Sequence, residues 1–195
     1  NVVADVEGNE PDGGVVVLGA HYDTVPETQG ANDNGSGVAT LLTVARQVSG
    51  RTYPFTLRFI AFGSEELGLF GSRAYVDSLS EEERASLVAM LNFDVPGSGQ
   101  MVEVIGDPYL VDEVLRLGDG DALDVRRGQA LQGASSDHAS FQAAGVPVAF
   151  FLADDVSRIN SPADFIEFVE PELMGTVVLL AMGLLDFLAE QHVAE

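Results

Sequence analysis

The chain has 195 residues, enough for one domain with a substantial core. Its 31 acidic residues oppose nine basic ones, all arginine, and the resulting net charge of −22 disfavours nucleic acid and anionic membranes as partners. Such a surface serves solubility or a high-salt habitat, or favours cationic substrates. Because the chain contains no cysteine, a metal would have to be held by His, Asp, Glu or weaker oxygen ligands.

Apolar runs rich in β-branched and aromatic residues predict the strands of a buried sheet. These runs are 15–20, 55–62, 87–93, 101–106 and 146–152, and residues 1–8 also resemble a strand followed by a turn. The chain opens on this strand, so a trimmed N-terminus is compatible with the sequence. Strands of this kind, alternating with longer helical patterns, favour a sheet covered on both faces. We therefore expect a three-layer α/β domain.

Helical spacing predicts three helices. Residues 37–48 would place Val38, Leu41, Leu42 and Ala45 on one face, and 109–118 and 171–190 have similar spacing. The apolar segment 176–189 is too short to cross a bilayer and includes Asp186, so we expect a core helix there. Residues 1–195 contain no linker or repeat, which predicts a single domain.

Two loops that follow predicted strands carry polar residues. His21 stands at the end of the first long strand, and Asp23 follows on the same side of extended backbone. The pair could bind and orient a metal, since a metal-bound histidine donates its second N–H to an oxygen acceptor; a structural histidine is the alternative. Asp33 lies between two asparagines ahead of glycines, where a simple Asx turn is the alternative.

Two further loops add carboxylates. Glu65 and Glu66 follow the strand 55–62, and adjacent acids at a buried strand end repel each other unless positive charge lies nearby. A metal would relieve this repulsion, with one carboxylate binding it and the other accepting a proton from water; an exposed acidic turn is the alternative. Asp94 follows the strand 87–93. Together the four loops predict a site for zinc, cobalt or manganese.

The ordered motifs resemble those of a known family. AHYDT, GANDNGSG, RFIAFGSEELGLFGS, LNFD and SSDHASF look like the motifs of the di-zinc aminopeptidases, mostly secreted bacterial metallopeptidases related to glutamate carboxypeptidase, glutaminyl cyclase and the transferrin receptor. The resemblance implies an α/β/α sandwich with a mostly parallel mixed sheet. It further implies one or two Zn²⁺ ions, a peptide substrate with a free N-terminus, and a secreted or periplasmic location.

The resemblance also assigns roles to individual residues. It implies that the first metal is bound by a histidine and an aspartate, that a second aspartate bridges both ions, and that one glutamate binds the second metal while its neighbour is the general base. The histidine is His21 and the first aspartate is Asp94, while the bridging aspartate is Asp33. Glu66 is the ligand of the second metal and Glu65 the general base, with Asp23 as the acid behind the histidine.

The remaining family positions concern the substrate pocket and the last metal ligand. Asp137 and His138 match a stretch that lines the substrate pocket, although helix capping by Ser136 or Asp137 is an alternative. The turn RINSPAD has Asn160 where the family has a histidine ligand, and Ile159 where a tyrosine often stands. An amide oxygen is a poor replacement for imidazole on zinc, so Asn160 is expected to be a weak ligand of a weakened second site.

These observations predict a zinc-dependent aminopeptidase, with activity reduced in this form. The alternatives are a catalytically impaired or non-catalytic peptidase-like binding domain and, less favoured because the chain has no tryptophan, a single-zinc glutaminyl cyclase. The sequence does not indicate the preferred N-terminal residue or the oligomeric state.

Overall fold

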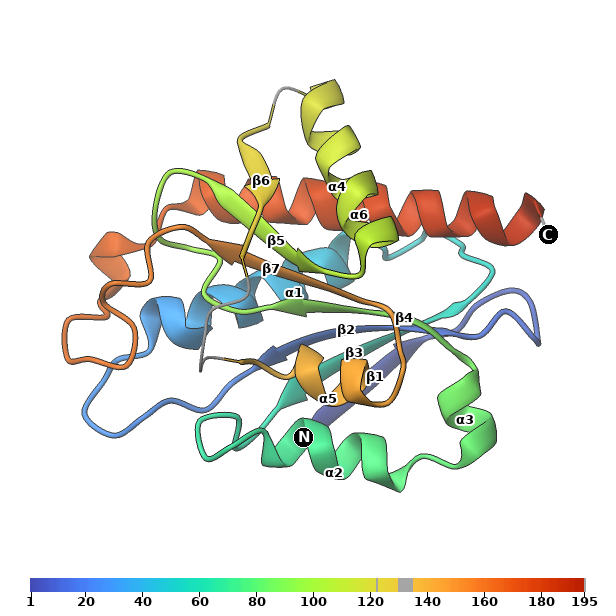
Figure 1. Cartoon of the computed structure of the whole chain (residues 1–195), viewed down its shortest axis with the longest axis horizontal. Coiled ribbons are helices and arrows are strands. Elements are labelled where there is room, and N and C mark those ends of the chain that lie inside the picture. Colours follow the sequence, from blue (N-terminus) through green and yellow to red (C-terminus); the bar gives the residue numbers. More distant parts are fainter. Residues whose placement is uncertain (122, 130–134, 195) are drawn as a thin grey trace.

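A computed structural model describes residues 1–121, 123–129 and 135–194. Its centre is a seven-stranded sheet with the strand order β1-β3-β2-β4-β7-β5-β6 (Figure 1). The strands are β1 (Val2–Val6), β2 (Val15–His21), β3 (Thr56–Phe62), β4 (Leu87–Phe93), β5 (Val102–Gly106), β6 (Val125–Arg127) and β7 (Val148–Ala153). The sheet is mixed: β3, β2, β4 and β7 run parallel, and so do β5 and β6, whereas β1 is antiparallel to β3 and β5 to β7.

The strand β2 shows why the sheet needs helices on both faces. Val16 and Leu18 belong to the larger apolar core, while Val17 between them belongs to a second core on the opposite face. Side chains alternate across a strand, so an uninterrupted apolar strand must be covered on each side. This confirms the predicted three-layer α/β architecture.

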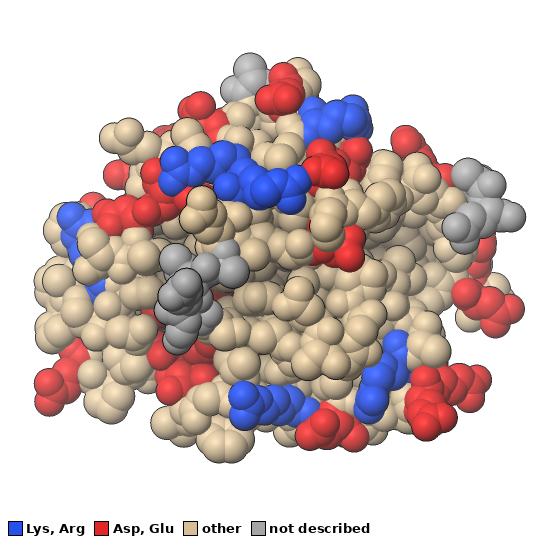
Figure 2. Space-filling view, viewed as in Figure 1, with Lys and Arg blue, Asp and Glu red and all other residues tan. Residues whose placement is uncertain are grey.

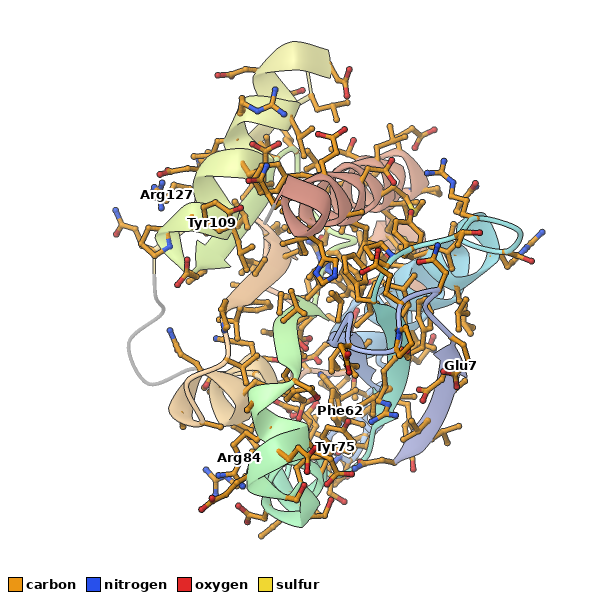
Figure 3. All side chains as sticks on the ribbon, turned by 90° about the vertical axis from the view of Figure 1, so that its right-hand side faces the viewer. Glu7, Phe62, Tyr75, Arg84, Tyr109 and Arg127 are labelled. Carbon is orange, nitrogen blue, oxygen red and sulfur yellow. The ribbon has the colours of Figure 1, made fainter. Side chains whose placement is uncertain are left out.

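The helices divide between these two cores. α1 (Gly37–Gln47), α4 (Pro108–Asp121) and α6 (Pro171–Ala194) pack on one face of the sheet, and α2 (Phe70–Ser78) and α5 (His138–Ala143) on the other (Figure 1). Phe62 at the end of β3 meets Tyr75 of α2 edge to face, with ring centroids 6.5 Å apart (Figure 3). The short α3 (Glu81–Ala85) precedes β4 and carries a capping box at Ser80.

The helix α6 is long and apolar enough to cross a membrane by length and composition, over Pro171–His192. Half of that window is buried within the protein, where it packs on the sheet beside α1 and α4. A core helix passes the same test. Leu180, Leu184 and Leu185 of α6 lie in the larger core, as the sequence predicts, but the helix extends beyond the segment 176–189 that was expected to be too short to cross a bilayer.

One detail of the helix prediction is wrong. The expected apolar face of α1 included Leu42, but Leu42 is 60% exposed, and Val44 is buried in its place. Successive helical residues are separated by about 100°, so the buried stripe follows Gly37, Leu41 and Val44 at spacings of four and three. Leu42 is rotated away from that stripe.

Parallel strands place their carboxyl ends at one edge of the sheet, and this edge positions the site. β2 ends at His21, β3 three residues before Glu65, and β4 immediately before Asp94. Ligands in open α/β sheets bind outside strand ends of this kind.

On the face of the molecule shown in Figure 2, acidic side chains lie mostly around the rim, with a few arginines among them.

Candidate metal centre

His21 is the centre of the site. Its side chain is 1% exposed, and Nδ1 donates a hydrogen bond to the backbone carbonyl oxygen of Asp23 at 3.0 Å. This contact leaves Nε2 facing three carboxylates: Asp94 Oδ1 at 3.1 Å, Asp33 Oδ1 at 3.2 Å and Glu65 Oε2 at 4.0 Å. A histidine held through Nδ1 in this way presents Nε2 to a metal.

The loop that carries Asp33 is fixed by its neighbours. Asn34 donates to the carbonyl of Phe93 at 3.0 Å and accepts from the backbone N–H of Gly37 at 3.0 Å, while Asn32 accepts from the N–H of Gly97 at 2.8 Å. These buried amides join the loop to the segment after β4. They explain why asparagines flank the aspartate, which the sequence alone left open.

The backbone of the two glutamates is held by Asp23. Its carboxylate accepts hydrogen bonds from the N–H groups of Glu65 at 3.0 Å and Glu66 at 3.3 Å. Its nearer oxygen is 3.7 Å from Nδ1 of His21, farther than its own carbonyl oxygen. Asp23 therefore contacts the histidine mainly through its backbone, and its side chain orients the turn after β3.

The site gathers several buried carboxyl groups, which a positive charge would stabilise in their ionised form. Burial raises the pKa of Glu65 to about 8 and that of Glu66 to about 7, and it also raises the pKa of Asp33. Burial alone would lower the pKa of His21, but hydrogen bonds to Asp33 and Asp94 and the surrounding negative charge raise it to about 12. Without a cation, this cluster retains protons at neutral pH.

The side chains fit a divalent metal. Two groups have ligand atoms all within 4.8 Å of one another: His21 with Asp33 and Asp94, and His21 with Glu65 and Glu66. Ligand atoms of a tetrahedral zinc site lie roughly 3.3–3.6 Å apart, close to the spacings around Nε2 of His21. In addition, Oε1 of Glu66 is buried without a hydrogen-bond partner among the described residues, so it is available to bind a cation.

A cavity of about 490 Å³ opens beside these residues. Asp33, Glu65, Glu66 and Asp94 line it on the metal side. Another part of its wall is apolar and forms a small core of its own, made by Val95, Ile105, Phe150, Leu152, Val156 and Ile159. The cavity thus combines a polar reactive corner with an apolar wall, the usual composition of a ligand site.

Of the four remaining predicted pocket residues, three line the cavity and one does not. Ile159 and Asn160 line the cavity, and so does His138, whose ring stacks on Phe150 with centroids 4.5 Å apart. Asp137 is fully buried and does not reach the cavity surface. Burial raises its pKa to about 6. The Asp137 side chain therefore lacks the direct access to substrate that the resemblance implied.

Sequence reasoning offered Asp164 only as a possible helix cap and did not connect it to the metal site. This side chain is 1% exposed, and its two oxygens accept hydrogen bonds from the backbone N–H groups of Asn32 and Asp33, each at 2.9 Å. The available sequence signal for such a role was the turn RINSPAD, which ends in this acidic residue. Its partner lies more than a hundred residues away in sequence, so only the fold identifies it.

A seven-stranded sheet with a histidine and four carboxylates at its parallel strand ends defines a metallohydrolase-like α/β domain. Residues 1–185 match the model of peptidase family M28, and the chain belongs to that family. It is 36% identical to aminopeptidase YwaD of Bacillus subtilis over 171 residues, which cover 81% of this chain and 37% of that protein.

Solved structures agree with this assignment. A zinc aminopeptidase from Bacillus subtilis superposes with a TM-score of 0.86 at 31% identity, over 93% of this chain and 48% of that one. A glutaminyl cyclase from an Acidobacteriales bacterium has a TM-score of 0.82 at 18% identity, over 97% of this chain and 73% of that one, and shares the fold. The chain spans less than half the length of the two Bacillus subtilis proteins, 37% of aminopeptidase YwaD and 48% of the zinc aminopeptidase structure.

Proposed function

We propose that residues 1–195 form the catalytic domain of a zinc-dependent aminopeptidase. The observation that carries this proposal is the position of Nε2 of His21, which faces Asp33 and Asp94 at 3.2 and 3.1 Å beside a cavity large enough for a peptide N-terminus. Membership of family M28 and similarity to zinc aminopeptidases support the same reaction. The substrate would be a peptide with a free N-terminus.

Each ligand residue has a distinct task in this proposal. His21, Asp33 and Asp94, whose ligand atoms lie together, would hold one zinc ion. By the roles that the family resemblance implies, Glu66 with Asp33 would hold a second. Zinc, when bound, polarises a carbonyl group and lowers the pKa of water. The carboxylates of Asp23 and Asp164 keep the ligand loops in place by accepting hydrogen bonds from the backbone N–H groups of those loops.

Glu65 is the proposed general base. Its side chain is 10% exposed, faces Nε2 of His21 at 4.0 Å and lines the cavity, so it can reach both water and substrate. It would accept the proton of the attacking water and deliver it to the departing amine. The raised pKa of about 8 in the metal-free chain reflects burial, and a bound cation would favour the ionised, basic form.

The acidic corner also accounts for cleavage at the N-terminus only. A free α-ammonium group is attracted by the carboxylates that line the metal side, while the apolar wall receives the first side chain. A blocked N-terminus would lose this attraction. The enzyme would therefore release single residues rather than cut within a chain.

We further propose that the second metal site is the weaker one. Asn160 lines the cavity where the family has a histidine, and its backbone is in the left-handed region with φ 55°. The second site would keep Glu66 and a share of Asp33, with at best a neutral amide as a third ligand. About one ion per chain would be held tightly.

Hydrolysis of leucine p-nitroanilide tests the proposed activity. We expect the zinc-loaded chain to release nitroaniline, a chelator to stop the release and added zinc to restore it. The matched control is the N-acetylated substrate, which should not be cleaved. A chain that binds no zinc and cleaves neither substrate would instead support a non-catalytic binding domain.

A further inference from the structure

The cavity extends across several strands, and its two ends differ in chemistry. In the sheet order β3-β2-β4-β7-β5, the strands β2 and β4 deliver His21 and Asp94 to the middle. The apolar wall comes mainly from β7, β5 and the loop after β7. The opposite end is formed by the segment from β3 into α2, and there Arg73 lines the cavity.

Arg73 differs from most basic residues of this chain. Six of the nine arginines form salt bridges with carboxylates: Arg51, Arg58, Arg116, Arg126, Arg127 and Arg158. Arg73 is exposed, and its guanidinium group has no hydrogen bond or ion pair within the described residues. The residues outside that range at 130–134 include no acid in the sequence.

An unpaired arginine at the mouth of an active site is suited to an anionic group of the ligand. The guanidinium group presents a rigid fork of donors that matches a carboxylate in bidentate fashion. If the first side chain of a peptide occupies the apolar wall and its scissile bond lies at the metal side, the departing part extends toward β3 and α2. That direction leads to Arg73.

On this basis, and resting on the proposed aminopeptidase function, we propose that Arg73 is a carboxylate-binding residue for the departing part of the substrate. The preferred substrates are then dipeptides, through their C-terminal carboxylate, or peptides with an acidic second residue. Both sources present the same chemistry to the guanidinium group. Arg73 is a specificity residue that has no part in the proton transfer assigned to Glu65.

Equilibrium binding tests this inference without turnover. The zinc-loaded Glu65→Gln chain is titrated calorimetrically with leucylalanine and its C-terminal amide, and with leucylglutamate amide and leucylglutamine amide. Each titration is repeated with Arg73→Gln added. The matched control adds Arg46→Gln instead, because Arg46 is exposed on α1, makes no ion pair within the described residues and does not line the cavity.

We expect the carboxylate form of at least one pair to bind roughly tenfold more tightly than its neutral partner, as for one charge-assisted hydrogen bond. Arg73→Gln should abolish the difference and Arg46→Gln should keep it. A difference in affinity between leucylalanine and its amide identifies the C-terminal carboxylate as the bound group. A difference between leucylglutamate amide and leucylglutamine amide identifies an acidic side chain. Equal affinities in both pairs, no binding of any peptide, or a difference that survives Arg73→Gln would overturn the inference.

Failure of the proposed function would give a different pattern. In that case the zinc-loaded parent chain would not hydrolyse leucylalanine, whereas the affinity ratios would still show whether Arg73 binds carboxylates. The two proposals are therefore decided by separate measurements.

Discussion

Oδ2 of Asp164 accepts a hydrogen bond at 2.9 Å from the backbone N–H of Asp33, the residue proposed to bridge two metal ions. The other oxygen of Asp164 accepts from Asn32 at the same distance. A buried carboxylate on the segment that carries Asn160 thus fixes the loop of a proposed metal ligand, and we expect the two segments to depend on each other.

Replacing Asp164 by Asn should weaken zinc binding without unfolding the chain. The amide would turn an NH₂ group toward a backbone N–H, and an unsatisfied buried donor costs about 1–3 kcal/mol. We expect zinc affinity to fall by roughly 10–100-fold, as for other residues that support a ligand.

Asp154→Asn is the control for Asp164→Asn. Asp154 also accepts two backbone N–H groups, those of Gln100 and Met101, but it is exposed and does not line the metal cavity. Calorimetric titration with zinc compares the two variants. If Asp164→Asn binds zinc as tightly as the parent chain, the proposed coupling between the two segments is wrong.

Glu65→Gln should keep zinc and lose most turnover. The amide is close in size and leaves the proposed ligands unchanged, whereas general-base transfer contributes roughly 10²–10⁴-fold to the rate. Glu66→Gln, one residue on, should instead lower zinc content. Turnover of leucine p-nitroanilide and metal analysis separate the two outcomes, and full activity of Glu65→Gln would show that the base is another group.

The metal-free chain should lose stability as the pH rises from about 6.5 to 8. The folded-state pKa values of Glu66 and Glu65, about 7 and about 8, lie above the ordinary value of 4.5, and that of His21 is also raised. The folded chain therefore binds more protons than the unfolded chain in this window, and its free energy of unfolding falls as those protons leave.

His138 opposes this trend only at the lower end of the window. Burial lowers its pKa from 6.5 to about 4, so its opposite contribution fades as the pH rises above 6.5, where the unfolded chain also loses that proton. Melting temperatures in the presence of a chelator measure the effect, and Glu65→Gln should reduce the slope. A metal-free chain that becomes more stable between pH 6.5 and 8 would contradict the proposed clustering of buried acids.

Asn160→His should raise zinc content and aminopeptidase rate together. Histidine tolerates the left-handed backbone at this position better than most residues and would supply the missing imidazole. Asn160→Gly, which keeps that backbone and removes the amide, should bind zinc like the parent chain. If the glycine variant loses a second ion that the parent binds, the asparagine is an adequate ligand and the weakened site is wrong.

The sequence predicted the strands well because they are uninterrupted runs of β-branched and aromatic residues. It missed α2, α3, α5 and β6, which are short and carry weak periodicity. Strand ends were informative about the site, since parallel strands bring His21 and Asp94 to one edge. The backbone contacts of Asp23 and Asp164 were not predictable, because they depend on how loops distant in sequence meet.

Zinc titration of the metal-free chain, with His21→Ala as the comparison, shows whether this cluster binds metal, because His21 belongs to both candidate ligand groups. Calorimetric titration should show about one tightly bound ion per parent chain and a weaker second one, and the variant should lose the tight site. A parent chain that binds no zinc, or a His21→Ala chain that binds it equally well, would show that His21 and its carboxylates do not form the proposed metal site.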